Sequence, residues 1–113
     1  MTANKVIEII DSLRPNAYNE EMKLRWISEL DGIVQRLVIQ KDEKDVVQYS
    51  YPEDMERELL IPYPFDNAYA LYLEAMIDYH NREYPNYNNS VQRFEALFTE
   101  YKRSYIREHP ARW

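Results

Sequence analysis

A single glycine, Gly32, occurs among the 113 residues of this chain, although average usage of about 7% would give roughly eight in this length. Loops that bind phosphates or dinucleotides need several glycines, because only glycine lets the backbone approach such a ligand closely. The sequence therefore disfavours nucleotide-binding α/β folds. It also contains no cysteine, which excludes disulfides, a thiolate nucleophile and a cysteine-ligated zinc site.

Helical periodicity covers most of the chain. Apolar residues recur at spacings of three and four in four segments, with prolines or asparagines at their boundaries. We expect a first helix from about Asn4 to Leu13, a second from an Asn19 cap to about Leu37, a third from an Asp66 cap to about Tyr84, and a fourth from an Asn88 or Asn89 cap to Pro110.

The connections between these segments suggest how the helices pack. The short connection over residues 85–88 is interpreted as a turn, so the last two helices should form an antiparallel pair. The third segment is apolar or aromatic over most of its circumference, which is typical of a central helix. The sequence therefore predicts one all-α domain over residues 1–113, an antiparallel bundle of about four helices with a short tail over residues 108–113.

Gly32 lies inside the second predicted helix. Glycine in a helix interior is less favourable than alanine by about 1 kcal/mol. We interpret it as leaving room for a close neighbour.

Residues 41–64 interrupt the helical pattern and form a long, partly extended arm between the second and third helices. The Val46–Tyr51 stretch has the β-branched and aromatic content of a short strand, whereas Pro62 and Pro64 exclude a central strand position. The pattern allows either a short β-hairpin or an ordered irregular arm. Because long connections in compact domains are often functional, we expect the arm to meet a partner and to show fast amide exchange between Lys41 and Glu58 in the free chain.

The charge and hydropathy of the chain limit the classes of partner that it is expected to bind. A net charge of -6 disfavours affinity that comes from neutralising DNA phosphates. No run of 18 or more apolar residues is present, so we expect no membrane span and synthesis in a cytoplasm.

Catalytic and metal-binding hypotheses find weak support. Glu74 and Asp78 are four residues apart in the third helix and could act as an acid and a base, but a solvated polar strip is the commoner meaning of such a pair. A metal site using His80 with Glu83, or His109, lacks the ligand spacing of known metal motifs. We therefore expect no cofactor and no metal. An enzyme built on Glu74, Asp78 and His80 is the least favoured hypothesis.

The C-terminal part of the fourth helix and the tail combine basic and aromatic residues. Such a mixture can bind single-stranded nucleic acid, meet an acidic protein, or complement the helix dipole. Glu100 and Glu108 dilute the positive charge, which favours the dipole interpretation. The residues involved are Lys102, Arg103, Arg107, His109 and Arg112, interleaved with Tyr101, Tyr105 and Trp113.

Tyrosine is the one residue type in excess, at 11 of 113 residues. Its amphipathic ring suits both the edge of a core and a protein interface. The sequence leaves these two alternatives open, and an interaction surface is the sharpest functional hypothesis that remains.

Several stretches of the chain resemble a known family of virion proteins. They are residues 24–32 (LRWISELDG), 59–66 (LLIPYPFD), 72–84 (YLEAMIDYHNREY) and 87–90 (YNNS). Together they are similar to the head-tail connectors, or head-completion adaptors, of tailed phages and prophages of Gram-positive bacteria. The resemblance covers most of the chain and weakens across residues 41–58. These are packing and turn motifs, so no binding residue of the family carries over by position.

The resemblance implies a structural protein. Its subunits would form a ring that docks on the portal protein, extends the DNA channel without binding DNA specifically, and meets the next neck protein; it would reside in the virion neck after assembly in the bacterial host cytoplasm. The alternative is a small prophage-encoded regulatory protein-binding module that acts as a monomer or dimer. The candidate contact residues are Tyr49, Tyr51, Tyr63, Phe65, Tyr84, Tyr87, Arg107 and Trp113.

Overall fold

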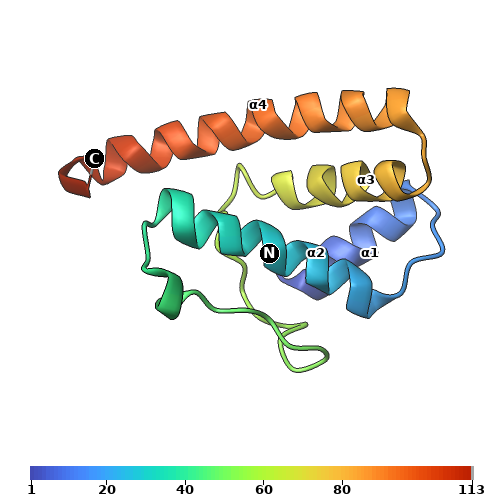
Figure 1. Cartoon of the computed structure of the whole chain (residues 1–113), viewed down its shortest axis with the longest axis horizontal. Coiled ribbons are helices and arrows are strands. Elements are labelled where there is room, and N and C mark those ends of the chain that lie inside the picture. The colour runs from blue at the N-terminus through green and yellow to red at the C-terminus, as the bar shows by residue number, and fades with distance from the viewer. Residues whose placement is uncertain (113) are drawn as a thin grey trace.

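The computed structural model describes residues 1–112, and its regular structure over that range is helical (Figure 1). The predicted all-α fold with four main helices is confirmed. A π-helical turn, η1, continues the second helix, and short 3-10 turns occur in the arm and near the C-terminus. The elements are α1 (Ala3–Leu13), α2 (Glu20–Ile33), η1 (Val34–Val38), η2 (Glu43–Asp45), α3 (Ala68–His80), α4 (Tyr84–Glu108) and η3 (Pro110–Arg112).

Side-chain caps fix the starts of the first two helices. The Thr2 hydroxyl accepts a hydrogen bond from the Lys5 N–H at 3.2 Å, and Asn19 caps α2 by accepting from the Met22 N–H at 2.8 Å, as its sequence predicted. The third helix begins at Ala68, two residues beyond the predicted Asp66 cap.

The boundary between α3 and α4 differs from the prediction. We expected the third helix to reach Tyr84 and Pro85 to start a turn, but α3 ends at His80 and Pro85 lies in the first turn of α4. A proline is tolerated there because the first residues of a helix have no intrahelical partner for their N–H groups. The turn is made by Arg82, whose φ is 59°, and by a bond from the Glu83 N–H to the Asp78 carbonyl at 2.8 Å, which is the pattern of a Schellman cap.

The core lies between α1, α2 and α3. Figure 1 shows α3 flanked by α4 on one side and by α1 and α2 on the other, which makes it the central helix that the sequence predicted. Fully buried side chains come from all three inner helices and from the arm, among them Ile10, Leu24, Ile61, Leu73 and Ile77.

The arm contains no strand within the described residues. A single antiparallel bridge joins Thr2 to Glu58, so the hairpin alternative is not confirmed. The arm is nevertheless bound to the helices, because Tyr49, Met55, Leu59 and Ile61 are buried.

The last helix is much longer than its neighbour. At 1.5 Å per residue, the 25 residues of α4 span about 37 Å and the 13 residues of α3 about 20 Å. The C-terminal part of α4 therefore extends beyond α3 (Figure 1). We call this part, residues 99–108, the α4 overhang.

Candidate functional site

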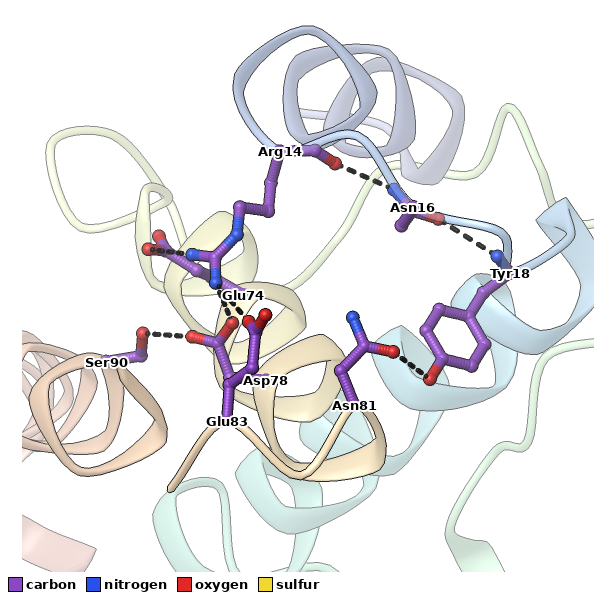
Figure 2. Close-up of polar contacts among 8 residues, drawn as sticks. All are labelled: Arg14, Asn16, Tyr18, Glu74, Asp78, Asn81, Glu83 and Ser90. Carbon is purple, nitrogen blue, oxygen red and sulfur yellow. Dashed lines mark hydrogen bonds and ion pairs between the residues drawn. The ribbon is translucent and has the colours of Figure 1, made fainter. Parts of the chain in front are cut away.

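The two carboxylates considered for catalysis lie in an ion-pair cluster centred on Arg14 (Figure 2). The Arg14 guanidinium contacts Glu74 at 3.2 Å, Glu83 at 3.0 Å and Asp78. Asp78 is fully buried and also accepts a hydrogen bond from the Ser90 hydroxyl of α4 at 3.1 Å. The cluster thus ties the residue that follows α1 to both α3 and α4.

The electrostatics of Asp78 fit a structural ion pair. Burial raises the pKa of Asp78, and the Arg14 guanidinium and the Ser90 hydroxyl act in the opposite direction because they stabilise the carboxylate. The expectation of a solvated polar strip was wrong for Asp78, since its carboxylate is buried and paired rather than hydrated.

The structure does not bring His80 to these carboxylates. Its ring packs 5.3 Å from the Trp26 ring, and its Nδ1 lies 2.8 Å from the Met76 carbonyl oxygen. His109 stacks on Tyr105 with ring centroids 4.0 Å apart, on α4. Over residues 1–112, no three His, Cys, Asp or Glu side chains gather so that they could hold a metal ion.

A buried carboxylate organises the arm. Asp31 of α2 is fully buried and accepts hydrogen bonds from the Tyr49 hydroxyl at 2.5 Å, from the Tyr69 hydroxyl at 2.5 Å and from the Leu60 N–H at 3.2 Å. The Tyr69 hydroxyl in turn accepts from the Ile61 N–H at 2.8 Å. Asp31 of α2 and its partner Tyr69 of α3 therefore hold two parts of the arm that are distant in sequence, one at Tyr49 and one at residues 60–61.

Two further polar side chains continue this attachment along the same face. Ser28 accepts a hydrogen bond from the Tyr49 N–H at 2.9 Å. The Gln35 amide accepts from the Val47 N–H at 2.8 Å and donates to the Val47 carbonyl at 3.0 Å. The backbone groups of the arm thus find side-chain partners where a sheet would have supplied a second strand.

These polar residues were missed by sequence reasoning. Ser28, Asp31 and Gln35 recur at spacings of three and four, like the apolar stripe beside them. That helical spacing of polar residues next to a buried stripe was the available signal, because a buried polar face implies a partner that it satisfies.

Burial dominates the proton affinities of this network. It raises the pKa of Asp31 above its ordinary value, although the hydrogen bonds from Tyr49, Tyr69 and Leu60 lower it. Burial and the neighbouring Asp31 carboxylate raise the pKa of both tyrosines. The tyrosine hydroxyls therefore remain protonated and act as the donors.

The second candidate region is an aromatic ladder on α4, formed by Phe94, Phe98, Tyr101 and Tyr105. Neighbouring ring centroids lie 5.5 Å, 6.1 Å and 6.4 Å apart along the helix. Only Tyr101 of the four is buried. Phe94, Phe98 and Tyr105 are half-buried and pack against the edge of the core.

A cleft of about 520 Å³ opens beside the α4 overhang. One wall is formed by Tyr101, Tyr105 and His109, and the other by Leu60 and the Pro62–Phe65 loop. Tyr63 belongs to this loop, and its side chain is 85% exposed. The cleft combines aromatic walls with an exposed tyrosine, which is the composition of a protein-binding surface.

The predicted contact residues fall into distinct environments. Tyr49 is buried, and its hydroxyl and N–H are both used inside the chain. Tyr84 and Tyr87 gather around Tyr79 at the start of α4, with ring centroids 6.3 Å and 5.3 Å from it. Tyr51, Tyr63, Tyr84 and Arg107 are exposed, Phe65 and Tyr87 are half-buried, and Trp113 lies outside the described residues.

None of the helices within residues 1–112 has both the length and the apolar character required to cross a membrane. Comparisons with protein-family models, curated proteins and solved structures found no match to this chain.

Proposed function

We propose that this protein is a structural subunit of a tailed-phage or prophage head-tail connector. Copies would assemble into a ring that docks on the portal protein, extends the DNA channel and receives the next neck protein in the virion. The sequence resemblance to such adaptors supports this proposal. The observation that carries it is the half-covered aromatic ladder of α4 beside an open cleft with the exposed Tyr63.

A ring subunit needs surfaces that stay uncovered until assembly. Exposed aromatic side chains next to a groove are typical of such surfaces. Their apolar area is unfavourably exposed to water in the monomer and becomes buried when a partner binds. Exposed and half-buried aromatic side chains lie at both ends of α3 here. Tyr63 and Phe65 precede the helix, and Tyr79, Tyr84 and Tyr87 lie around its C-terminal end.

The charge of the chain suits a DNA channel. A net charge of -6 on every copy would give a ring that repels phosphates, so DNA would slide through it rather than bind. Tyr51, Tyr63, Phe65, Tyr84, Tyr87, Arg107 and Trp113 remain the proposed contacts. Tyr49 is withdrawn from that set because its polar groups are engaged internally.

The decisive experiment mixes the purified chain with the portal protein of the phage or prophage that encodes it. We expect electron micrographs to show a second ring stacked on the portal. Y63A should weaken stacking without lowering the melting temperature, since the Tyr63 side chain is exposed. L13A is the matched control, because Leu13 is also exposed, at 72%, and is not a proposed contact.

A small species that ignores the portal would contradict the connector proposal. That result would favour the alternative of a regulatory binding module acting as a monomer or dimer.

A further inference from the structure

The cleft between the α4 overhang and the loop that precedes α3 contains a buried polar side chain that the chain itself does not use (Figure 1). Tyr101 lines this cleft and is only 4% exposed, yet its hydroxyl forms no hydrogen bond within residues 1–112. Every fully inaccessible side-chain nitrogen or oxygen of the described residues has a hydrogen-bond partner. The Tyr101 hydroxyl is therefore accessible, and the cleft is the opening through which a ligand can reach it.

The same cleft contains further hydroxyl groups without an internal partner. The side chains of Tyr63, Ser104 and Tyr105 line it, and none of their hydroxyls forms a hydrogen bond with another group of the described chain. Burial raises the pKa of Tyr101 to about 12, so its hydroxyl is protonated and can donate at neutral pH. A ligand that suits this set of hydroxyls supplies hydrogen-bond acceptors.

A carboxylate also lines the cleft, at a position that its own helix makes unfavourable. Glu108 is the last residue of α4, where the helix dipole disfavours a negative charge. It is exposed and forms no ion pair with a basic group of residues 1–112. A cationic group of a ligand would neutralise this carboxylate.

The walls of the cleft are aromatic. The ring centroids of Phe65 and Tyr101 lie 6.0 Å apart, and Tyr105 stacks on His109 with ring centroids 4.0 Å apart. Aromatic grooves of this kind bind proline-rich segments in the polyproline II conformation. Each proline of such a segment offers a carbonyl acceptor and has no N–H that would need a partner. The aromatic walls and the unpaired hydroxyls thus match the same ligand.

Two other classes of ligand match the cleft less well. The phosphates of a nucleic acid would be repelled by Glu108 and by the net charge of -6. A partner that adds a β-strand needs an exposed sheet edge, and the described residues contain no strand.

We propose that this cleft binds a proline-rich segment of a partner protein, in the polyproline II conformation and with an arginine or lysine among the prolines. The proline rings lie against the aromatic walls, the tyrosine and serine hydroxyls donate to the carbonyl oxygens of the segment, and its basic side chain pairs with Glu108. The inference deepens the proposed function and rests on it for the identity of the partner, which is a neighbouring protein of the virion.

Isothermal titration calorimetry of the full chain tests the proposal with a set of acetylated, amidated octapeptides. Each peptide contains prolines and a single arginine, which occupies each position in turn across the set. We expect at least one member to bind with a dissociation constant below about 1 mM. Replacing its arginine by glutamine should weaken binding. A glycine-serine peptide with one arginine should not bind, because it has the charge without the polyproline II conformation.

Variants that remove single hydroxyls test the predicted donors. Y101F and Y105F keep the aromatic rings, and each should weaken binding of the proline peptide by a factor of about 2–10. Y72F is the matched control, because the Tyr72 hydroxyl also has no internal partner but Tyr72 does not line the cleft. It should bind like the wild-type chain. Unchanged melting temperatures will show that the variants are folded.

The ion pair is tested by combining a variant with a changed peptide. E108Q should weaken binding of the arginine peptide by a factor of about 2–5 and leave binding of the glutamine peptide unchanged, because only the first peptide presents a cation. E95Q is its control, since Glu95 is exposed on α4, forms no internal ion pair and lies outside the cleft.

Four results would overturn the proposal. They are proline peptides that do not bind up to about 1 mM, a glycine-serine peptide that binds as tightly as they do, an arginine that contributes nothing, and binding that Y101F, Y105F and E108Q leave unchanged. Peptide binding by a chain that ignores the portal would support this site and contradict the connector function. A chain that stacks on the portal but binds none of the peptides would do the reverse.

Discussion

The Tyr49 hydroxyl donates a hydrogen bond to the fully buried Asp31 carboxylate at 2.5 Å, across 18 residues of sequence. Tyr69 donates to the other carboxylate oxygen at the same distance. No cation forms an ion pair with Asp31 within the described residues, so its hydrogen bonds all come from neutral donors, while the more distant charge of Arg57 adds a weaker stabilisation. The arm is consequently fastened to the helical core by polar contacts as well as by apolar packing.

The substitution D31N should destabilise the fold. An amide offers one acceptor oxygen to three donors, and its NH2 group would face the Tyr49 or Tyr69 hydroxyl. Leaving buried donors unsatisfied costs about 1–3 kcal/mol, which urea unfolding would measure. Y49F is the comparison variant, and it should lose less because it removes one donor and leaves Asp31 two. A D31N chain as stable as the wild type would show that Asp31 does not hold the arm.

The pH dependence of stability should carry the signature of Asp31. Its pKa is raised in the folded chain above the ordinary value of 3.8 because burial penalises the carboxylate. The folded chain therefore binds this proton more tightly than the unfolded chain, so stability is gained as pH falls through the folded-state pKa and is fully gained below 3.8.

Comparison of the wild-type chain with D31N isolates that contribution, because the other carboxylates are common to both. We expect the free energy of unfolding of the wild type, relative to D31N, to rise between neutral pH and about pH 4. A difference that stays constant over this range would contradict a raised pKa.

G32A should stabilise the chain. A β-carbon added at Gly32 would meet no atom within 4 Å, so our expectation of a close neighbour was wrong. Alanine is more favourable than glycine in a helix interior by about 0.5–1 kcal/mol. Thermal unfolding would show a higher melting temperature, and a decrease would mean that the helix requires glycine there for another reason.

R82G should also stabilise the chain, for the opposite reason. Arg82 has a φ of 59° at the C-terminal cap of α3, a conformation that disfavours a residue with a β-carbon by about 1 kcal/mol. Because the Arg82 side chain is exposed, removing it should cause no loss of packing in the core. R82A keeps the β-carbon and serves as the control; equal stability of R82G and R82A would argue against strain.

Amide exchange should divide the arm into two classes. The N–H groups of Val47, Tyr49, Leu60 and Ile61 donate to side chains and should be protected, whereas those of residues 42–44 should exchange fast. This replaces the uniform fast exchange expected from the sequence. Hydrogen-deuterium exchange with residue resolution would decide between the two, and D31N should remove protection at Leu60.

Local sequence was sufficient for the helices themselves. The spacing of apolar residues identified four helical segments, the Asn19 cap fixed the start of α2, and the near-continuous apolar surface of the third segment indicated a central helix. These features depend on interactions within a few turns, which the order of residues already contains. Pro85 shows the limit of this approach, because a proline both ends one helix and is tolerated at the start of the next.

Only the tertiary structure decided how the arm is held and what the polar residues inside the helices do. Asp31 meets Tyr49 and Tyr69, and Arg14 meets Asp78, across separations of 18 to 64 residues. Periodicity shows that a side chain faces inward but does not identify its partner. The free energy of a buried charge depends on that partner, which the sequence alone left undetermined.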